Sequence, residues 1–186
     1  MNPYLVIITS LLLSACSNLT SLPYFNKDEP ITAHTPGIGI SQSEPPQLAS
    51  IAFASDTQFN SERIKGCVDE LLAAIEEEGR VINYVGRDTL TATAVLAGEK
   101  RQLGVLPSQY QIRFHLAVLS QGEGTRYGFS RITLAQEDRF NYNTHDFKPL
   151  SPTSNDLTAV YHSLKDLYQA LDDCMAEPES GAKQDS

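Results

Sequence analysis

The sequence predicts an α+β domain, in which a mainly antiparallel sheet of four to five strands carries two helices on one face, in the order strand, helix, four strands, helix. Apolar residues alternate with their neighbours in residues 89–96 and 110–118, a period of two that is typical of strands. Apolar residues recur every three or four positions in residues 64–75 and 157–171, which indicates amphipathic helices. A sheet with one apolar face needs a cover, and the two helices would supply it.

The first half of the domain follows from short apolar runs and capping residues. Residues 48–54 are a short apolar run and form the first expected strand. Asn60 or Ser61 can cap the helix that follows, and Gly79 can end it. Residues 81–85 form a second short strand, which precedes the two long alternating strands.

A glycine-rich turn should reverse the chain after the second alternating strand. Residues 121–124 read Gln-Gly-Glu-Gly and predict a hairpin turn into a strand over residues 125–135. In that strand the apolar phase slips between Phe129 and Ile132. The slip predicts a bulge or a twist near residues 130–131.

Segments of different composition flank this domain. We expect a signal peptide in residues 1–15, a lipidated cysteine with a flexible tether in 16–47, a single domain in 48–177 and a disordered tail in 178–186. Residues 17–47 are rich in Ser, Thr, Pro and Gly and show no apolar periodicity, which is typical of a linker. The alternative, in which the Gly-Ile-Gly-Ile stretch of this segment packs on the domain, stays open.

The N-terminal segment carries the strongest motif. The apolar run 5–13 is too short to span a bilayer as a helix, which needs about 20 residues, and has the length of the apolar part of a secretory signal. It ends in Leu13-Ser14-Ala15-Cys16, which resembles the bacterial lipobox. The resemblance implies diacylation of the Cys16 thiol, cleavage before it and acylation of the new amino group. Because no Lys or Arg precedes the run, an incidental cysteine near the end of an ordinary signal peptide is the alternative.

The residue after the lipobox indicates the destination. Ser17 follows Cys16, and in lipoprotein sorting the lack of Asp there resembles the default route to the outer membrane. The expected location is therefore the outer membrane, with a lipid anchor and a domain that faces the periplasm. Acylated Cys16 would make membrane lipid one partner, since several acyl chains anchor a protein almost permanently.

Charge and histidine spacing narrow the function further. The chain has 14 Lys and Arg against 23 Asp and Glu, a net charge of −9, which argues against nucleic acid because phosphate contacts need clustered basic residues. It also disfavours a peripheral contact with anionic lipid. The four histidines show no metal-ligand spacing, so no metal or cofactor is expected; they are His34, His115, His145 and His162.

Two further cysteines follow Cys16. In an exported protein two thiols tend to pair, and Cys67 and Cys174 lie near the start of the first helix and the end of the second. Antiparallel helices would bring those ends together, which makes this pair a disulfide candidate. The alternative is two buried thiols that fill the core.

No motif of an active site emerges, and no enzymatic activity is expected. The glycines of Gly122-x-Gly124-x-x-x-Gly128 precede a strand, whereas a dinucleotide-binding loop opens a helix. Ser130 lacks the second glycine of a nucleophile elbow and is expected to be a strand residue. The mixed aromatic and polar stretch 138–143 is either a contact site or a packed connection.

The order of elements resembles two families. The lipobox is followed by a short strand, a helix, paired strands, a long hairpin and a Phe-, Tyr- and Asn-containing connection into a last helix. Residues 109–119, 131–143 and 157–171 carry most of the resemblance. This series resembles the outer-membrane lipopolysaccharide-assembly lipoproteins and the auxiliary lipoproteins of ABC-type lipid transport systems. The resemblance implies a non-enzymatic accessory subunit.

Three functions therefore compete. The first is an anchored, non-catalytic interaction subunit of an envelope assembly or transport complex, with an envelope protein as partner and Thr91, Thr93, Arg113 and His115 as the candidate partner face. The second is a carrier of a lipid or another apolar ligand between sheet and helices. The third is an envelope hydrolase, which needs convergent polar residues that the sequence does not reveal.

Overall fold

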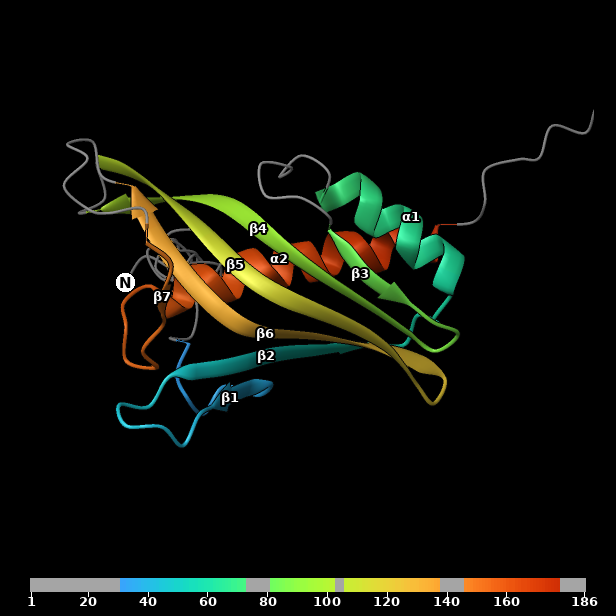
Figure 1. Ribbon diagram of the computed structural model, residues 1–186, viewed down its shortest axis with the longest axis horizontal. Helices are drawn as coiled ribbons and strands as arrows, with labels where there is room; N and C mark the ends of the chain where they lie inside the picture. Colours follow the sequence, from blue (N-terminus) through green and yellow to red (C-terminus); the bar gives the residue numbers. More distant parts are fainter. Residues whose placement is uncertain (1–30, 73–80, 103–105, 138–145, 178–186) are drawn as a thin grey trace, which may run out of the picture. The chain divides into compact units, whose positions relative to one another are not determined.

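The computed structural model describes residues 31–72, 81–102, 106–137 and 146–177 (Figure 1). Two helices and seven strands follow one another in the order β1 (Ile38–Ile40), β2 (Leu48–Ser55), α1 (Ser61–Leu72), β3 (Ile82–Val85), β4 (Thr89–Gln102), β5 (Leu106–Gln121), β6 (Gly124–Glu137), β7 (Lys148–Pro149) and α2 (Leu157–Ala176).

The strands form one antiparallel sheet in the order β1-β2-β6-β5-β4-β3, with β7 paired to β6. The α+β class and the two helices agree with the prediction, and so does the run of elements from β2 through α1 and four strands to α2. The predicted number of four to five strands is wrong. The missing strands are β1 and β7, which have three and two residues and are too short to show a period of two.

Strand β1 lies in the segment that was expected to be a tether. Ile38 pairs with Ile51 and Gly39 with Ser50, so the alternative in which this stretch packs on the domain is the one observed. Gly37 has a φ of +86°, and a side chain there would collide with the carbonyl of Ala52. Glycine therefore permits both the left-handed turn and the close approach of the chain to β2.

Both helices pack on the same face of the sheet. Helix α1 contacts β3 and β4, α2 contacts β2 and β4, and the helices contact each other. In Figure 1 the strands pass in front of α2. The strands contribute buried side chains at every second position, and these form the core with the helices; on β4, β5 and β6 they include Leu90, Ala92, Ala94, Ile112, Phe114, Leu116, Val118, Tyr127 and Phe129.

The slip of the apolar phase in β6 is a bulge, as predicted. The pairing of β5 with β6 shifts between Arg113 and His115, and Arg131 adopts a φ of +52°. Only a few per cent of residues other than glycine adopt a positive φ. The extra residue returns Ile132 to the buried face, where it is 2% exposed.

Several expectations concern residues outside the described ranges. They are the signal peptide, Cys16, residues 17–30 of the tether, the cap at Gly79, the stretch 138–143, His145 and the tail 178–186. The structure leaves these expectations as they stand.

The aromatic core generates the first prediction. Phe129 is fully buried, and its ring lies edge-on to Phe114 at 5.4 Å and to Phe53 at 6.1 Å between centroids. Replacing it by alanine opens a cavity, so Phe129→Ala should lower the free energy of unfolding by about 3–5 kcal/mol, measured by urea denaturation. Leu119→Ala is the control, because Leu119 is 41% exposed on the other face and should cost about 0.5 kcal/mol or less. Equal losses in the two variants would contradict this core.

Candidate functional site

One face of the sheet carries no helix of the described chain, and we call it the open face. Since side chains alternate along a strand, the residues between the core positions point to this face. On the four central strands it consists of Ser50, Ala52 and Ala54 (β2), Thr91, Thr93 and Val95 (β4), Gln111, Arg113, His115, Ala117 and Leu119 (β5), and Arg126, Gly128, Ser130 and Thr133 (β6).

The open face brings together all four residues of the predicted partner face. Thr93 and His115 are cross-strand partners. Arg113 lies two residues from His115 on β5, and Thr91 lies two residues from Thr93 on β4. Thr93 is exposed, and its hydroxyl accepts a hydrogen bond of 2.7 Å from the side-chain amide of Asn83.

Two arginines of the same face were missed by the sequence analysis. Arg126 pairs across the sheet with Leu119 of β5 and with Ala54 of β2, and Arg131 is the bulge residue of β6; both are exposed. They belong to the site because β6 lies between β2 and β5 in the sheet, which nothing local in the sequence indicates.

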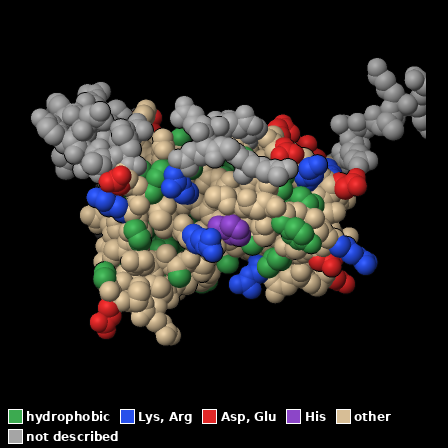
Figure 2. Space-filling view, in the orientation of Figure 1, with side chains coloured by type: hydrophobic (Ala, Val, Ile, Leu, Met, Phe, Trp, Pro, Cys, Tyr) green, Lys and Arg blue, Asp and Glu red, His purple; other side chains and the backbone are tan. Residues whose placement is uncertain are grey.

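The charge over the middle of this face has one sign, whereas exposed Glu99 lies on the same face farther along β4. In residues 48–55, 89–98, 109–121 and 124–136 there is no Asp or Glu, and the basic side chains are Arg113, His115, Arg126 and Arg131. Figure 2 shows Lys and Arg side chains and a histidine over the middle of the molecule, with Asp and Glu near the margins of the view. An acidic protein thus presents a basic sheet face.

Arg113 is held in place by an aromatic ring. Its guanidinium carbon lies 3.9 Å from the centre of the Phe147 ring, directly before β7. A guanidinium on a ring face gains about 0.5–2 kcal/mol, depending on exposure. The ring therefore fixes the orientation of the arginine on the open face.

Ser130 and His115 are also cross-strand partners. A serine beside a histidine is the combination found in catalytic dyads. No hydrogen bond joins them in the structure, and residues 89–98, 109–121 and 124–136 of the surrounding strands contain no acid to orient the imidazole. Nucleophilic catalysis needs such an oriented base. Among the described residues, no group of His, Cys, Asp and Glu could hold a metal ion.

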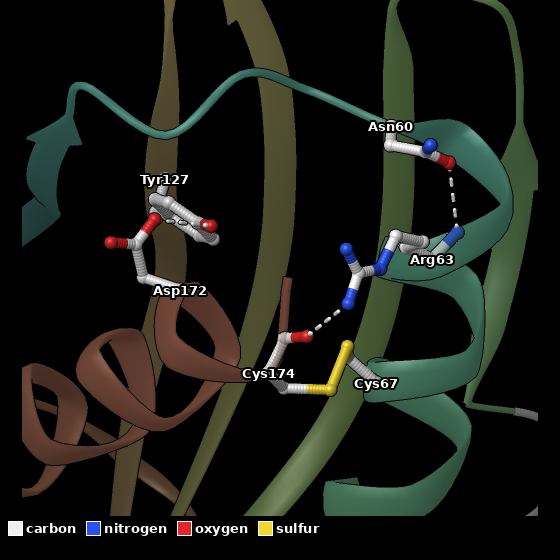
Figure 3. The surroundings of a disulfide bond; sticks show 6 residues. All are labelled: Asn60, Arg63, Cys67, Tyr127, Asp172 and Cys174. Carbon is white, nitrogen blue, oxygen red and sulfur yellow. Dashed lines mark hydrogen bonds between the residues drawn. A yellow bond between two sulfur atoms is a disulfide. The ribbon is translucent and has the colours of Figure 1, made fainter. Parts of the chain in front are cut away.

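The helix side of the sheet carries a polar cluster around Asp172 (Figure 3). The Tyr127 hydroxyl donates to one oxygen of the Asp172 carboxylate at 3.1 Å, and the Thr57 hydroxyl donates to the other at 3.1 Å. Burial, and then the charge of Asp172, raises the pKa of the Tyr127 phenol well above its usual value of about 10. The cluster ties the chain before α1 to β6 and to the end of α2, which is a structural role.

Cys67 and Cys174 form a disulfide, as expected (Figure 3). Their Cα atoms lie 5.9 Å apart, and the bond links residues 107 positions apart in the sequence. The Arg63 guanidinium donates to the backbone carbonyl of Cys174 at 3.5 Å beside it. The bond therefore fixes the second turn of α1 to the last turns of α2.

Three cavities lined by described residues are surface features. They have volumes of about 540, 340 and 320 Å³ and lie beside Thr125 and Gly124, beside Gly98 and Tyr110, and beside Asp156 and Leu150, respectively. Ala92 and Ala94, the small residues that would leave room for a carried ligand, line none of the three. Both are buried on β4, which contacts both helices, so these alanines favour close packing over a ligand chamber.

Comparison with known proteins assigns no family to this chain. No protein-family model and no curated protein matches the chain. One solved structure that it resembles is a DUF4468 family protein from Bacteroides ovatus, at 8% identity and a TM-score of 0.45 over 76% of this chain and 93% of that one. A likeness at that TM-score carries no argument about function.

The disulfide generates a prediction on stability. In the chain-entropy model a bond that closes a loop of this length stabilises by about 4–5 kcal/mol, so the variant Cys67→Ala/Cys174→Ala should lose roughly that amount in guanidinium unfolding. Dithiothreitol should destabilise the native chain similarly and leave the variant unchanged. Two thiols that react with iodoacetamide in the denatured, unreduced protein would disprove the bond.

The Tyr127 phenol generates a prediction on pH. The folded chain keeps the proton of Tyr127 to a higher pH than the unfolded chain, so this contribution to stability is complete below about pH 10 and falls as pH rises further. Tyr127→Phe should therefore show a smaller loss of unfolding free energy between pH 9 and pH 11 in urea titrations. At pH 8 it should be less stable by about 1.5–3 kcal/mol, because the bond to a carboxylate is gone. A pH profile identical to that of the native chain would contradict this assignment.

Proposed function

We propose that the protein is an outer-membrane lipoprotein, anchored through acylated Cys16, whose periplasmic domain is a non-catalytic accessory or interaction subunit of an envelope assembly or transport complex. The observation that carries the proposal is the open face. It gathers the four expected partner residues on a side of the sheet that no helix of the described chain covers and adds two exposed arginines to them. A partner protein would complete that side of the sheet.

Other features support the anchor and the compartment. The lipobox Leu13-Ser14-Ala15-Cys16 supplies the site of acylation. The disulfide agrees with an oxidising compartment such as the periplasm. Among the described helices, none combines the length and the apolar character needed to cross a bilayer. The resemblance to lipopolysaccharide-assembly and transport-auxiliary lipoproteins points to the same kind of role.

The tether limits where the partner can be. The described domain begins at Ile31 and includes β1, so the segment between it and Cys16 comprises residues 17–30 rather than 17–47. Fully extended, such a segment spans at most about 50 Å. The domain would therefore act close to the membrane, on a partner that is itself membrane-bound or membrane-proximal.

The test is photo-crosslinking in intact cells of the native host. A benzoylphenylalanine residue at Thr93, exposed on the open face, should capture an envelope protein. The same residue at Gln169, exposed on α2, is the matched control and should capture it at least tenfold less. Cys16→Ala should lower the capture at Thr93, because the chain is no longer held at the membrane.

Mass spectrometry of the protein from the same cells tests the anchor separately. We expect a mature chain that starts at Cys16 with a diacylglyceryl group on sulfur and an acyl group on nitrogen. An unmodified start or cleavage elsewhere would contradict the anchor. Equal capture from Thr93 and Gln169 would contradict the role of the open face.

A further inference from the structure

The basic groups of the open face form one array. Arg126, His115 and Arg113 lie on the adjacent strands β6 and β5, and Arg131 lies at the bulge beside them. At about 3.4 Å per residue, the five steps from Arg126 to Arg131 cover roughly 17 Å along β6. That length corresponds to a segment of about five or six extended residues.

The two most exposed arginines of the array form no ion pair with the described chain. Arg126 and Arg131 are exposed, and no ion pair joins either of them to a described residue. No acid occurs in residues 48–55, 89–98, 109–121 and 124–136, although the chain has 23 acids against 14 basic residues. A group that approaches the middle of this face therefore meets positive charge only, which selects for an anion.

The basic residues indicate the geometry of the anion. All three permanent charges are arginines, and a guanidinium binds a carboxylate or a phosphate through two parallel hydrogen bonds, which an ammonium cannot do. Phe147 already orients one of them, Arg113, and such preorganisation lowers the entropic cost of binding. The array is suited to carboxylates presented by a partner.

Small side chains lie between the basic ones. Ala52 of β2, Gly128 of β6 and Ala117 of β5 are neighbours across the strands and form a row, which continues to Thr91 of β4. Because these side chains are short, the backbone of a second chain can approach the sheet here. The face thus offers room for a polypeptide segment with basic groups on either side of it.

A membrane surface fits this face less well. Exposed acids flank the array: Asp88 before β4, Glu99 in β4 and Glu123 in the turn between β5 and β6. A flat anionic bilayer would meet these acids together with the arginines, and the chain as a whole carries −9. A narrow segment can lie between them.

We propose that the open face binds an acidic polypeptide segment, with Asp or Glu side chains that pair with Arg126 and Arg131. This inference rests on the proposed function and specifies the chemistry of its partner.

The test uses the full lipidated chain in neutral detergent micelles. A fluorescein-labelled peptide of ten glutamates is titrated by anisotropy at low salt, with a peptide of ten glutamines as the uncharged control. We expect a Kd at least tenfold lower for the glutamate peptide, and a further weakening of its binding as salt rises.

Charge-reversal variants locate the binding. Arg126→Glu/Arg131→Glu should raise the Kd for the glutamate peptide at least tenfold. Lys65→Glu/Lys165→Glu, on α1 and α2, changes the net charge by the same amount and should raise it less than threefold. If the sheet variant does not retain the native unfolding temperature, Arg126→Gln/Arg131→Gln replaces it, with the same direction expected.

Three results would overturn the inference. They are equal binding of the two peptides, equal losses in the two variant pairs, and displacement of the glutamate peptide by micelles doped with phosphatidylglycerol but not by neutral micelles. The last result would assign the face to lipid phosphates. Since capture at Thr93 is measured independently, a positive crosslink with negative peptide binding leaves the proposed function standing and removes only the acidic partner.

Discussion

Burial of the sheet on one side only is the constraint on which the rest of the structure depends. The alternating strands give β4, β5 and β6 one continuous apolar face, and both helices pack there. Once that face is covered, every second residue of the same strands must point to the other side. The composition of those residues, small and polar with a few basic groups, is therefore a property of the fold as much as of the site.

Covalent and polar links hold the two helices on that side. The disulfide joins α1 to α2, and the carboxylate of Asp172 joins the end of α2 to Tyr127 of β6 and to Thr57 before α1. Cys67 and Tyr127 lie far from Asp172 and Cys174 in the sequence, and Figure 3 shows all four in one region of the structure. A sheet fixed in this way presents the open face as a rigid surface, which favours recognition because little conformational entropy is lost on binding.

Which elements could be predicted from the sequence depended on the length of each element and on how the strands pair. The long strands β4 and β5 and helix α2 repeat their period often enough to be predicted, and so was the bulge near Arg131, because it breaks such a period. β1 and β7 are too short to show a period of two, and their pairing depends on tertiary contacts that the local sequence does not reveal. For the same reason Thr93 and Arg113 were predicted on one face, whereas Arg126 was not, since nothing local indicates that β6 lies between β2 and β5. The absence of acids from residues 48–55, 89–98, 109–121 and 124–136 was a signal that the sequence did contain.

Charge and tether length together decide how the open face can be used. A tether of at most about 50 Å would keep the domain near the bilayer, but electrostatic attraction or repulsion acts only over about 8 Å at physiological salt. A chain with a net charge of −9 gains nothing by lying on an anionic surface, so the proposed anchor would concentrate it near the membrane without pressing it against lipid. The basic face then remains available to a neighbouring protein. If the anchor is as proposed, it also raises the local concentration of that face, so that even a modest affinity for an acidic segment would suffice for association.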